Sequence, residues 1–322
     1  MNRREFLAAA AAAPLGLATA PRAAARVLGG TPVALVTADL EAHVVAYDLD
    51  AHRVLRRIPT LSGPRSIETV GNNTAALVAH TQAGAISLID VRTLRVRSVL
   101  RGLDEPRYTA AGPTGRYAYV TDAGRGELVT VDLDADRIVH RLAVGAHARH
   151  LSHSPTDPVI WTALGFDAPA IVVVDLSTPA RPRVAQRIVP PFPAHDVVFA
   201  PDGARVWVSS GNQRRLAVYD ASTYRPLFLL PAGQPPQHIT FRSHAAYVTS
   251  DEAIRVHRLA DGALRRETAV PAGSYNVTQG DNRVFTPSLE RGTLCILDRS
   301  GRILASPVLA KAAHDACLVV TA

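Results

Sequence analysis

The chain has 322 residues, of which 47% are hydrophobic and 20% are charged, and its formal net charge is +7. This composition excludes a disordered chain and an all-apolar membrane protein, and two cysteines exclude a disulfide scaffold or a four-thiolate zinc site. The 23 prolines and 21 glycines favour short elements joined by turns over long helices. Nearly all basic residues are arginine, a uniform bias that we attribute to genomic composition and not to nucleic-acid binding.

Residues 1–25 have the pattern of a signal peptide. Arg3 and Arg4 precede an apolar run from Phe6 to Ala20, which is too short for a good membrane span, and small residues follow. The order of the first seven residues resembles the twin-arginine export motif, with an ordinary Sec signal as the alternative. We expect cleavage after Ala25, export to the periplasm, no membrane span after signal removal and a single domain over residues 26–322.

One pattern recurs seven times along the rest of the chain. An alternating apolar run ends in an acidic residue, a polar turn follows, and a second alternating run begins. The residues that open these turns are Asp48, Asp90, Asp132, Asp175, Asp220, His257 and Asp298. Aspartate at such a position accepts backbone N–H groups of the turn, so we interpret these aspartates as structural.

Each repeat contains four short runs with the period-two alternation of β-strands. Turns such as Pro113–Gly115 open a repeat, and a run such as Arg116–Thr121 follows. A four-stranded unit of about 42 residues cannot bury both of its faces alone, whereas radially arranged units bury them against each other. The sequence therefore predicts an all-β, seven-bladed β-propeller with four-stranded blades.

The two ends of the chain predict how the ring closes. The first unit, Val33 to Ile58, lacks the short run that precedes the other units, and His314 to Val320 supplies such a run. We expect this C-terminal run to be the innermost strand of the first blade, which removes an exposed sheet edge.

Several short motifs resemble those of the YVTN family. Tyr119–Asp122 and Tyr247–Ser250 resemble its Tyr-Val-Thr-Asn signature, and Pro201–Gly203 and Ala143–Gly145 match other parts of its repeat. The resemblance covers about residues 31–322 and implies the propeller fold. Members include exported YncE-like proteins, some of which bind DNA, and proteins linked to periplasmic quinone-dependent oxidation; more distant relatives include haem-binding propellers of nitrite reductase type and lactonases.

The innermost runs are expected to meet at a central funnel, and their alignment gives two polar rows. The first row is Arg65, Arg107, Arg149, His195, Gln237, Tyr275 and His314. The second row is Ser66, Tyr108, His150, Asp196, His238, Asn276 and Asp315. Three arginines on consecutive blades would attract an anion. The candidate ligand-binding residues are Arg65, Arg107, Arg149, Tyr108, His195, Gln237 and Tyr275.

The histidines of the two rows are candidate metal ligands. They are His150, His195, His238 and His314. Neutral imidazole binds zinc, copper, nickel or haem iron, but these residues come from different blades and have no short ligand spacing. Ordinary solvated residues at the start of each inner strand would give the same rows. No catalytic residue is predicted, because nucleophile-elbow, zinc-protease, phosphate-loop and dinucleotide motifs are all absent.

The favoured function is that of an exported, monomeric binding or scaffold protein without enzymatic activity. Its funnel would bind an anionic small molecule or a periplasmic protein partner. The alternative is an accessory or cofactor-binding subunit, with haem, a metal or a quinone link, in a periplasmic redox system. A lactonase-type hydrolase, which would need a metal, and a single-stranded DNA binder are less favoured. Aromatic residues are 5% of the chain, too few for an evident base-stacking platform.

Overall fold

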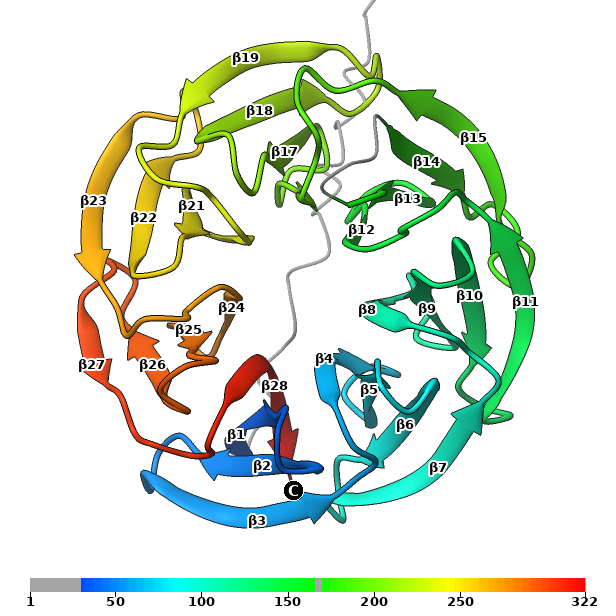
Figure 1. Cartoon of the computed structure of the whole chain (residues 1–322), viewed down its shortest axis with the longest axis vertical. Coiled ribbons are helices and arrows are strands. Elements are labelled where there is room, and N and C mark those ends of the chain that lie inside the picture. Colours follow the sequence, from blue (N-terminus) through cyan, green and yellow to red (C-terminus); the bar gives the residue numbers. More distant parts are fainter. Residues whose placement is uncertain (1–29, 166–169, 322) are drawn as a thin grey trace, which may run out of the picture.

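The computed structural model describes residues 30–165 and 170–321, and within these ranges it contains β-strands and no helix. Seven four-stranded antiparallel sheets surround a central channel like the blades of a propeller (Figure 1). This confirms the predicted fold class and the predicted number of strands in a blade. The expected signal peptide lies outside the described residues.

Three blades come from the first half of the chain, and their strands are given from the channel outward. Blade 1 holds β28 (Ala313–Thr321), β1 (Thr31–Ala38), β2 (His43–Asp48) and β3 (Arg53–Pro59). Blade 2 holds β4 (Pro64–Val70), β5 (Ala75–His80), β6 (Ala85–Asp90) and β7 (Arg95–Arg101). Blade 3 holds β8 (Pro106–Ala111), β9 (Tyr117–Asp122), β10 (Glu127–Asp132) and β11 (Arg137–Ala143).

The other four blades follow in chain order around the ring. Blade 4 holds β12 (Leu151–His153), β13 (Val159–Ala163), β14 (Ile171–Asp175) and β15 (Arg183–Ile188). Blade 5 holds β16 (Asp196–Phe199), β17 (Arg205–Ser209), β18 (Arg215–Asp220) and β19 (Pro226–Pro231). Blade 6 holds β20 (Ile239–Arg242), β21 (Ala245–Thr249), β22 (Ala253–Arg258) and β23 (Leu264–Ala269). Blade 7 holds β24 (Thr278–Gly280), β25 (Arg283–Pro287), β26 (Leu294–Leu297) and β27 (Ile303–Ala305).

The hydrophobic core lies between neighbouring blades. Successive side chains of a strand point to opposite faces, so each middle strand contributes to two clusters. In β1, Leu35 packs in one cluster with Ile67 of blade 2, whereas Val36 packs in another with Phe285 of blade 7. The outer strands are more exposed, and β7 alternates between exposed and partly buried residues along its whole length. No blade has a separate core, so each depends on its two neighbours.

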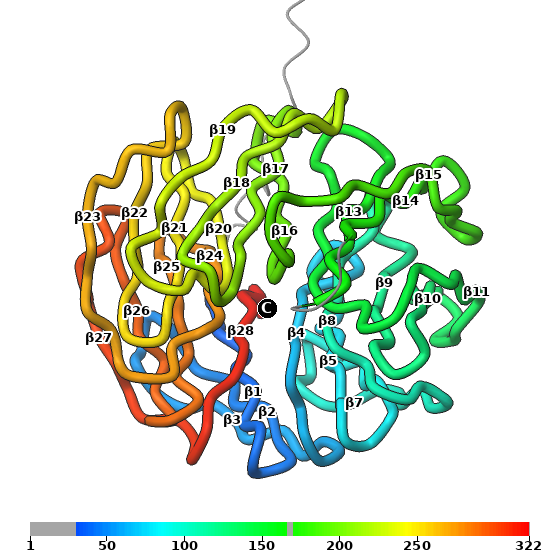
Figure 2. The backbone as a smooth tube through the Cα atoms, turned by 45° about the horizontal axis from the view of Figure 1, so that its top comes forward, coloured from blue at the N-terminus to red at the C-terminus, as the bar shows by residue number. Residues whose placement is uncertain are grey.

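The ring closes through the last strand of the chain, as the sequence predicts. Strand β28 is antiparallel to β1, with register from Thr31 opposite Thr321 to Ala38 opposite Ala313. Figure 2 shows the red end of the chain beside the blue beginning. Blade 1 is therefore assembled from both ends of the described chain.

The repeated aspartates have the predicted structural role. The Asp48 side chain accepts the backbone N–H groups of Asp50 and Ala51 at 3.0 and 2.9 Å. In blade 6, where His257 replaces aspartate, the buried imidazole Nδ1 donates to the Gly262 carbonyl at 2.9 Å. Both turns thus have a hydrogen bond between a side chain and the backbone. The aspartate side chain accepts it, whereas the histidine side chain donates it.

The hydroxyl group of the Tyr-Val-Thr motif joins one blade to the next. Thr121 Oγ1 in blade 3 donates to the Arg149 carbonyl of blade 4 at 2.6 Å. Ser209 in blade 5 does the same to Gln237 of blade 6 at 2.6 Å, and Thr249 in blade 6 to Tyr275 of blade 7. A hydroxyl at this position thus holds the start of the adjacent inner strand.

We expect Thr121→Val to lower the free energy of unfolding by about 1–2 kcal/mol, because it removes the hydrogen bond that Thr121 donates to the Arg149 carbonyl of the adjacent blade. Urea unfolding monitored by tryptophan fluorescence measures this change. Thr130→Val is the matched control, since Thr130 is equally buried in the same blade and its hydroxyl has no hydrogen-bond partner among the described residues. Equal losses in both variants would contradict an inter-blade role for the motif hydroxyl.

Candidate functional site

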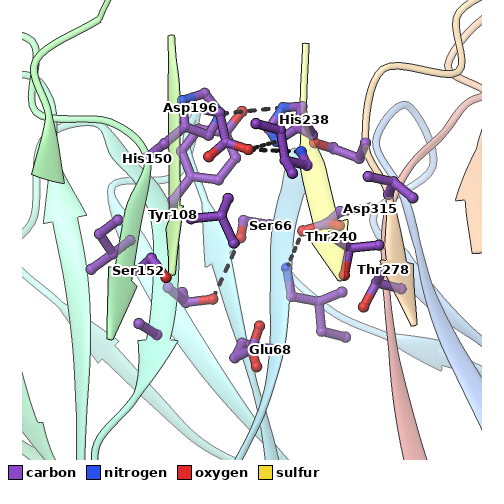
Figure 3. A pocket seen from close by; sticks show the side chains of 18 of the residues that line it. Ser66, Glu68, Tyr108, His150, Ser152, Asp196, His238, Thr240, Thr278 and Asp315 are labelled. Carbon is purple, nitrogen blue, oxygen red and sulfur yellow. Dashed lines mark hydrogen bonds and ion pairs between the residues drawn. The ribbon is translucent and has the colours of Figure 1, made fainter. Parts of the chain in front are cut away.

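The inner strands of the seven blades line a central cavity of about 410 Å³ (Figure 3). Its lining includes every residue of the second polar row. These are Ser66, Tyr108, His150, Asp196, His238, Asn276 and Asp315. None of the seven residues of the first row lines it. Because consecutive residues of an extended chain point to opposite sides, only one of two adjacent rows can face the channel.

Three residues of the first polar row interact with groups outside the cavity lining. The Gln237 amide donates to the Gly211 carbonyl at 2.8 Å, and His314 Nδ1 lies 2.8 Å from the Arg65 carbonyl. Tyr275 is partly buried, and burial followed by its hydrogen bond with Asp251 raises the pKa of its hydroxyl. Gln237 and Tyr275 are thus turned away from the channel, toward neighbouring loops.

Three histidines from consecutive blades meet at one end of the channel. We call His150, His195 and His238 the histidine cluster; one ligand atom from each lies within 4.8 Å of the others. His150 Nε2 is 3.2 Å from His238 Nε2, and the ring centroids of His150 and His195 are 4.5 Å apart. His314, the fourth candidate of the sequence, does not belong to this group.

Neighbouring side chains fix the orientation of the histidine cluster. The Tyr108 ring packs on His150 with the centroids 3.7 Å apart. Asp196 Oδ2 lies 3.8 Å from His238 Nδ1 and accepts the backbone N–H of Ile239 at 2.9 Å. Figure 3 shows Tyr108, His150, Asp196 and His238 at the same end of the cavity. Blades 3, 4, 5 and 6 therefore all contribute side chains to this end of the cavity.

The three imidazoles are neutral at neutral pH. Burial lowers the pKa of His150 and His238 well below the ordinary value, and the neighbouring histidines and Arg149 lower both further. Burial and Arg149 lower the pKa of His195 to about 3. A neutral imidazole has one nitrogen with a free lone pair, which is the form that binds metals or accepts hydrogen bonds.

Arginines of three consecutive blades surround the same end of the channel. We call Arg65, Arg107 and Arg149 the arginine mouth. Burial lowers the pKa of Arg107, Glu105 opposes this effect, and the charges of Arg149 and Arg65 lower it further. Arg65 and Arg149 are therefore each close enough to Arg107 to repel it, as their equivalent positions in the repeat predict.

Two carboxylates pair with the arginine mouth. Arg65 Nη1 lies 3.2 Å from Asp39 Oδ2, and Arg107 forms an ion pair with Glu105. Each contact is made by one terminal nitrogen, and the Nε atoms of Arg65 and Arg107 are buried without a hydrogen-bond partner among the described residues. Donors on these two guanidinium groups thus remain available for a further acceptor.

The cavity also contains an acidic side chain that the two rows did not include. Glu68 lies two residues after Ser66 on β4, faces the channel and is drawn at the end of Figure 3 away from the histidine cluster. Burial, followed by the charge of Asp315, raises the pKa of Glu68 to about 8. Strand alternation from Ser66 would have found it, since residues two apart share a face.

Solved structures with similar folds are propellers. A hydrazine synthase chain from Kuenenia stuttgartiensis is 13% identical over 83% of this chain and 92% of its own, with a TM-score of 0.73. A functionally unknown protein from Desulfotomaculum acetoxidans is 11% identical over 90% of this chain and 99% of its own, with a TM-score of 0.79. The dihydro-heme d1 dehydrogenase NirN, in complex with DHE, is 17% identical over 86% of this chain, with a TM-score of 0.67.

These likenesses show the fold. This chain spans 64% of the length of NirN, so part of that protein has no counterpart here. No protein-family model and no curated protein matches the sequence. Within residues 30–165 and 170–321 there is also no helix that could span a membrane.

Proposed function

We propose that the protein is an exported, periplasmic binding propeller that takes a small anionic ligand at the arginine mouth. One observation carries this proposal: Arg65, Arg107 and Arg149 lie near the start of three consecutive inner strands, and the charges of Arg65 and Arg149 both act on Arg107. Guanidinium groups converging in a partly buried site favour a carboxylate or phosphate, because each can donate two parallel hydrogen bonds to it.

The contacts of the mouth support an anion as the missing acceptor. Asp39 and Glu105 hold Arg65 and Arg107 in place, while the buried Nε atoms of both arginines have no acceptor among the described residues. A buried donor without an acceptor costs free energy that a bound anion would recover. We expect a compact, multivalent anion, since the donors come from more than one blade.

The test is thermal melting with citrate, phosphate or a neutral solute. Citrate and phosphate should raise the melting temperature of the parent protein to a plateau, and the increase should shrink as sodium chloride is added. Replacing Arg65, Arg107 and Arg149 together by glutamine should abolish the increase. Without anion this variant should melt at the parent temperature or slightly above it, because like-charge repulsion is removed.

A matched variant separates the mouth from the general charge of the surface. Arg53, Arg95 and Arg101 are exposed on β3 and β7, and changing them to glutamine removes the same three charges. This variant should keep the full response to citrate. Equal responses in all three proteins would show that the arginine mouth is ordinary solvated surface, and the proposal would fail.

The haem alternative fits this channel end poorly. NirN carries a haem-derived ligand, and haem iron is held by an imidazole whose nitrogen a flat macrocycle must reach. His150 and His195 are 2% and 3% exposed, and their rings contact each other and the neighbouring aromatic groups. Neighbouring rings therefore cover both imidazoles, and we do not extend a haem role to these histidines.

A further inference from the structure

We propose that the histidine cluster is a binding site for one divalent transition-metal ion, of the kind represented by Zn²⁺ or Cu²⁺. This site lies beside the arginine mouth but consists of different side chains, so it does not depend on the proposed anion ligand. His150, His195 and His238 supply the three ligands from blades 4, 5 and 6.

Two of the three ligand atoms have the spacing of a metal site. Zinc binds imidazole nitrogen at about 2.0–2.1 Å, so two nitrogens in a tetrahedral site lie about 3.3 Å apart. His150 Nε2 and His238 Nε2 are separated by 3.2 Å, and an atom of His195 lies within 4.8 Å of both. The His195 nitrogen would move closer to the other two when the ion binds.

Surrounding groups match what a metal-binding imidazole needs. If His238 binds through Nε2, its Nδ1 carries a proton and faces Asp196 Oδ2 at 3.8 Å. A slightly closer approach would form the carboxylate–histidine hydrogen bond that fixes a ligating ring and strengthens it as a donor. Asp196 is itself held by the Ile239 N–H, and the Tyr108 ring packs against His150. The ligands are thus positioned before any ion arrives.

Imidazole is also the right donor for such an ion. His150 and His195 are buried and His238 is partly buried. Nitrogen ligands suit zinc and copper, and three protein ligands leave a position for a small molecule. A calcium or magnesium ion is excluded by this donor set, because both prefer oxygen. The simple alternative is a metal-free cluster in which one imidazole donates a hydrogen bond from Nε2 to the other.

The charge of Arg149 opposes a cation here, since the same charge lowers the pKa of all three histidines. Asp196 beside His238 can supply compensating negative charge, and an anion at the arginine mouth would add to it. If the proposed function holds as well, metal and anion should strengthen each other's binding by the same factor.

The experiment uses the mature protein, stripped with a chelator and titrated with Zn²⁺ or Cu²⁺ in a buffer without multivalent anions. Calorimetry should show one ion bound per chain with a dissociation constant in the micromolar range or below. His150→Ala and His238→Ala should each weaken binding at least 100-fold. In the copper-loaded protein, electron paramagnetic resonance should show splitting by several equivalent nitrogens, which a surface-bound ion would not give.

His153→Gln is the matched control. His153 lies on β12 and lines the same cavity, but it is not a member of the histidine cluster. It should bind metal as the parent does. Saturable binding that survives both alanine variants, or no binding by the folded parent, would overturn the proposal.

The triple arginine-to-glutamine variant separates the two proposals. It should still bind one metal ion, and lose only the response to citrate. A parent that responds to citrate but binds no metal would overturn the metal site and leave the anion site standing. A parent that binds metal but does not respond to citrate would overturn the anion site and leave the metal site standing.

Discussion

A protein truncated after Asp315 should be insoluble or largely unfolded at 25 °C. The missing residues form most of β28, whose Cys317 and Val319 are buried in the cluster between blades 1 and 2. Burial of one such apolar side chain contributes about 1.5–3 kcal/mol, and the truncation also exposes the hydrogen-bonding edge of β1. The loss should therefore reach about 5 kcal/mol or more, comparable to the whole stability of a typical domain. Solubility after expression and the melting temperature measure it.

A circular permutant distinguishes the contribution of strand β28 from that of the position of β28 in the chain. Thr321 lies opposite Thr31, so residues 313–322 can be placed before Gly30 through a short turn, with Ala312 as the new C-terminus. This permutant keeps every strand and should melt close to the parent temperature. A truncated protein that melts like the parent would contradict closure through β28.

Glu68→Gln should stabilise the protein at alkaline pH and leave its stability almost unchanged near pH 4.5. The folded-state pKa of Glu68 is raised to about 8, above the value of 4.5 for an unfolded chain. Between these values the folded protein binds one proton more than the unfolded chain, so its stability falls as pH rises. Glutamine has no proton to lose. The gain should grow through this window and level off above pH 8 at about 2–3 kcal/mol, reduced by the solvent in the channel.

Urea unfolding at pH 5 and pH 9 measures this effect. Glu252→Gln serves as the control for the loss of a carboxylate alone, because Glu252 is exposed on the turn between β21 and β22. Parallel stability curves for the parent and Glu68→Gln would show that Glu68 has no raised pKa in the channel.

The fold was predictable because the repeat encodes it locally. A turn aspartate such as Asp48 or Asp220 accepts backbone N–H groups a few residues away, and this local contact recurs in almost every blade. Closure was predictable for a related reason: one unit lacked a strand, and one leftover run at the chain end had the right pattern. Both inferences follow from the number of repeats and the number of strands in each repeat. Neither requires knowing which residues distant in sequence are close in space.

The candidate site was predictable only in part. Equivalent positions of the repeat correctly grouped the second row, and that row lines the cavity. The sequence could not decide which row faces the channel, because this depends on where each inner strand begins. His195 precedes β16 yet lies against His150, so strand alternation does not describe it. Asp39, which pairs with Arg65, lies on a loop of blade 1 outside the aligned runs.

Closure through the last strand also constrains the order in which the molecule can form. Up to 290 residues separate the partners on β1 and β28, whereas the strands within blades 2 to 7 pair with near neighbours in sequence. Contacts between distant residues form slowly, because the long loop between them must first be ordered. Blades 2 to 7 can therefore assemble while the chain is being synthesised, but β1 waits for the final residues to emerge. Until then its open edge and the unfilled first blade are the parts that a chaperone would have to cover.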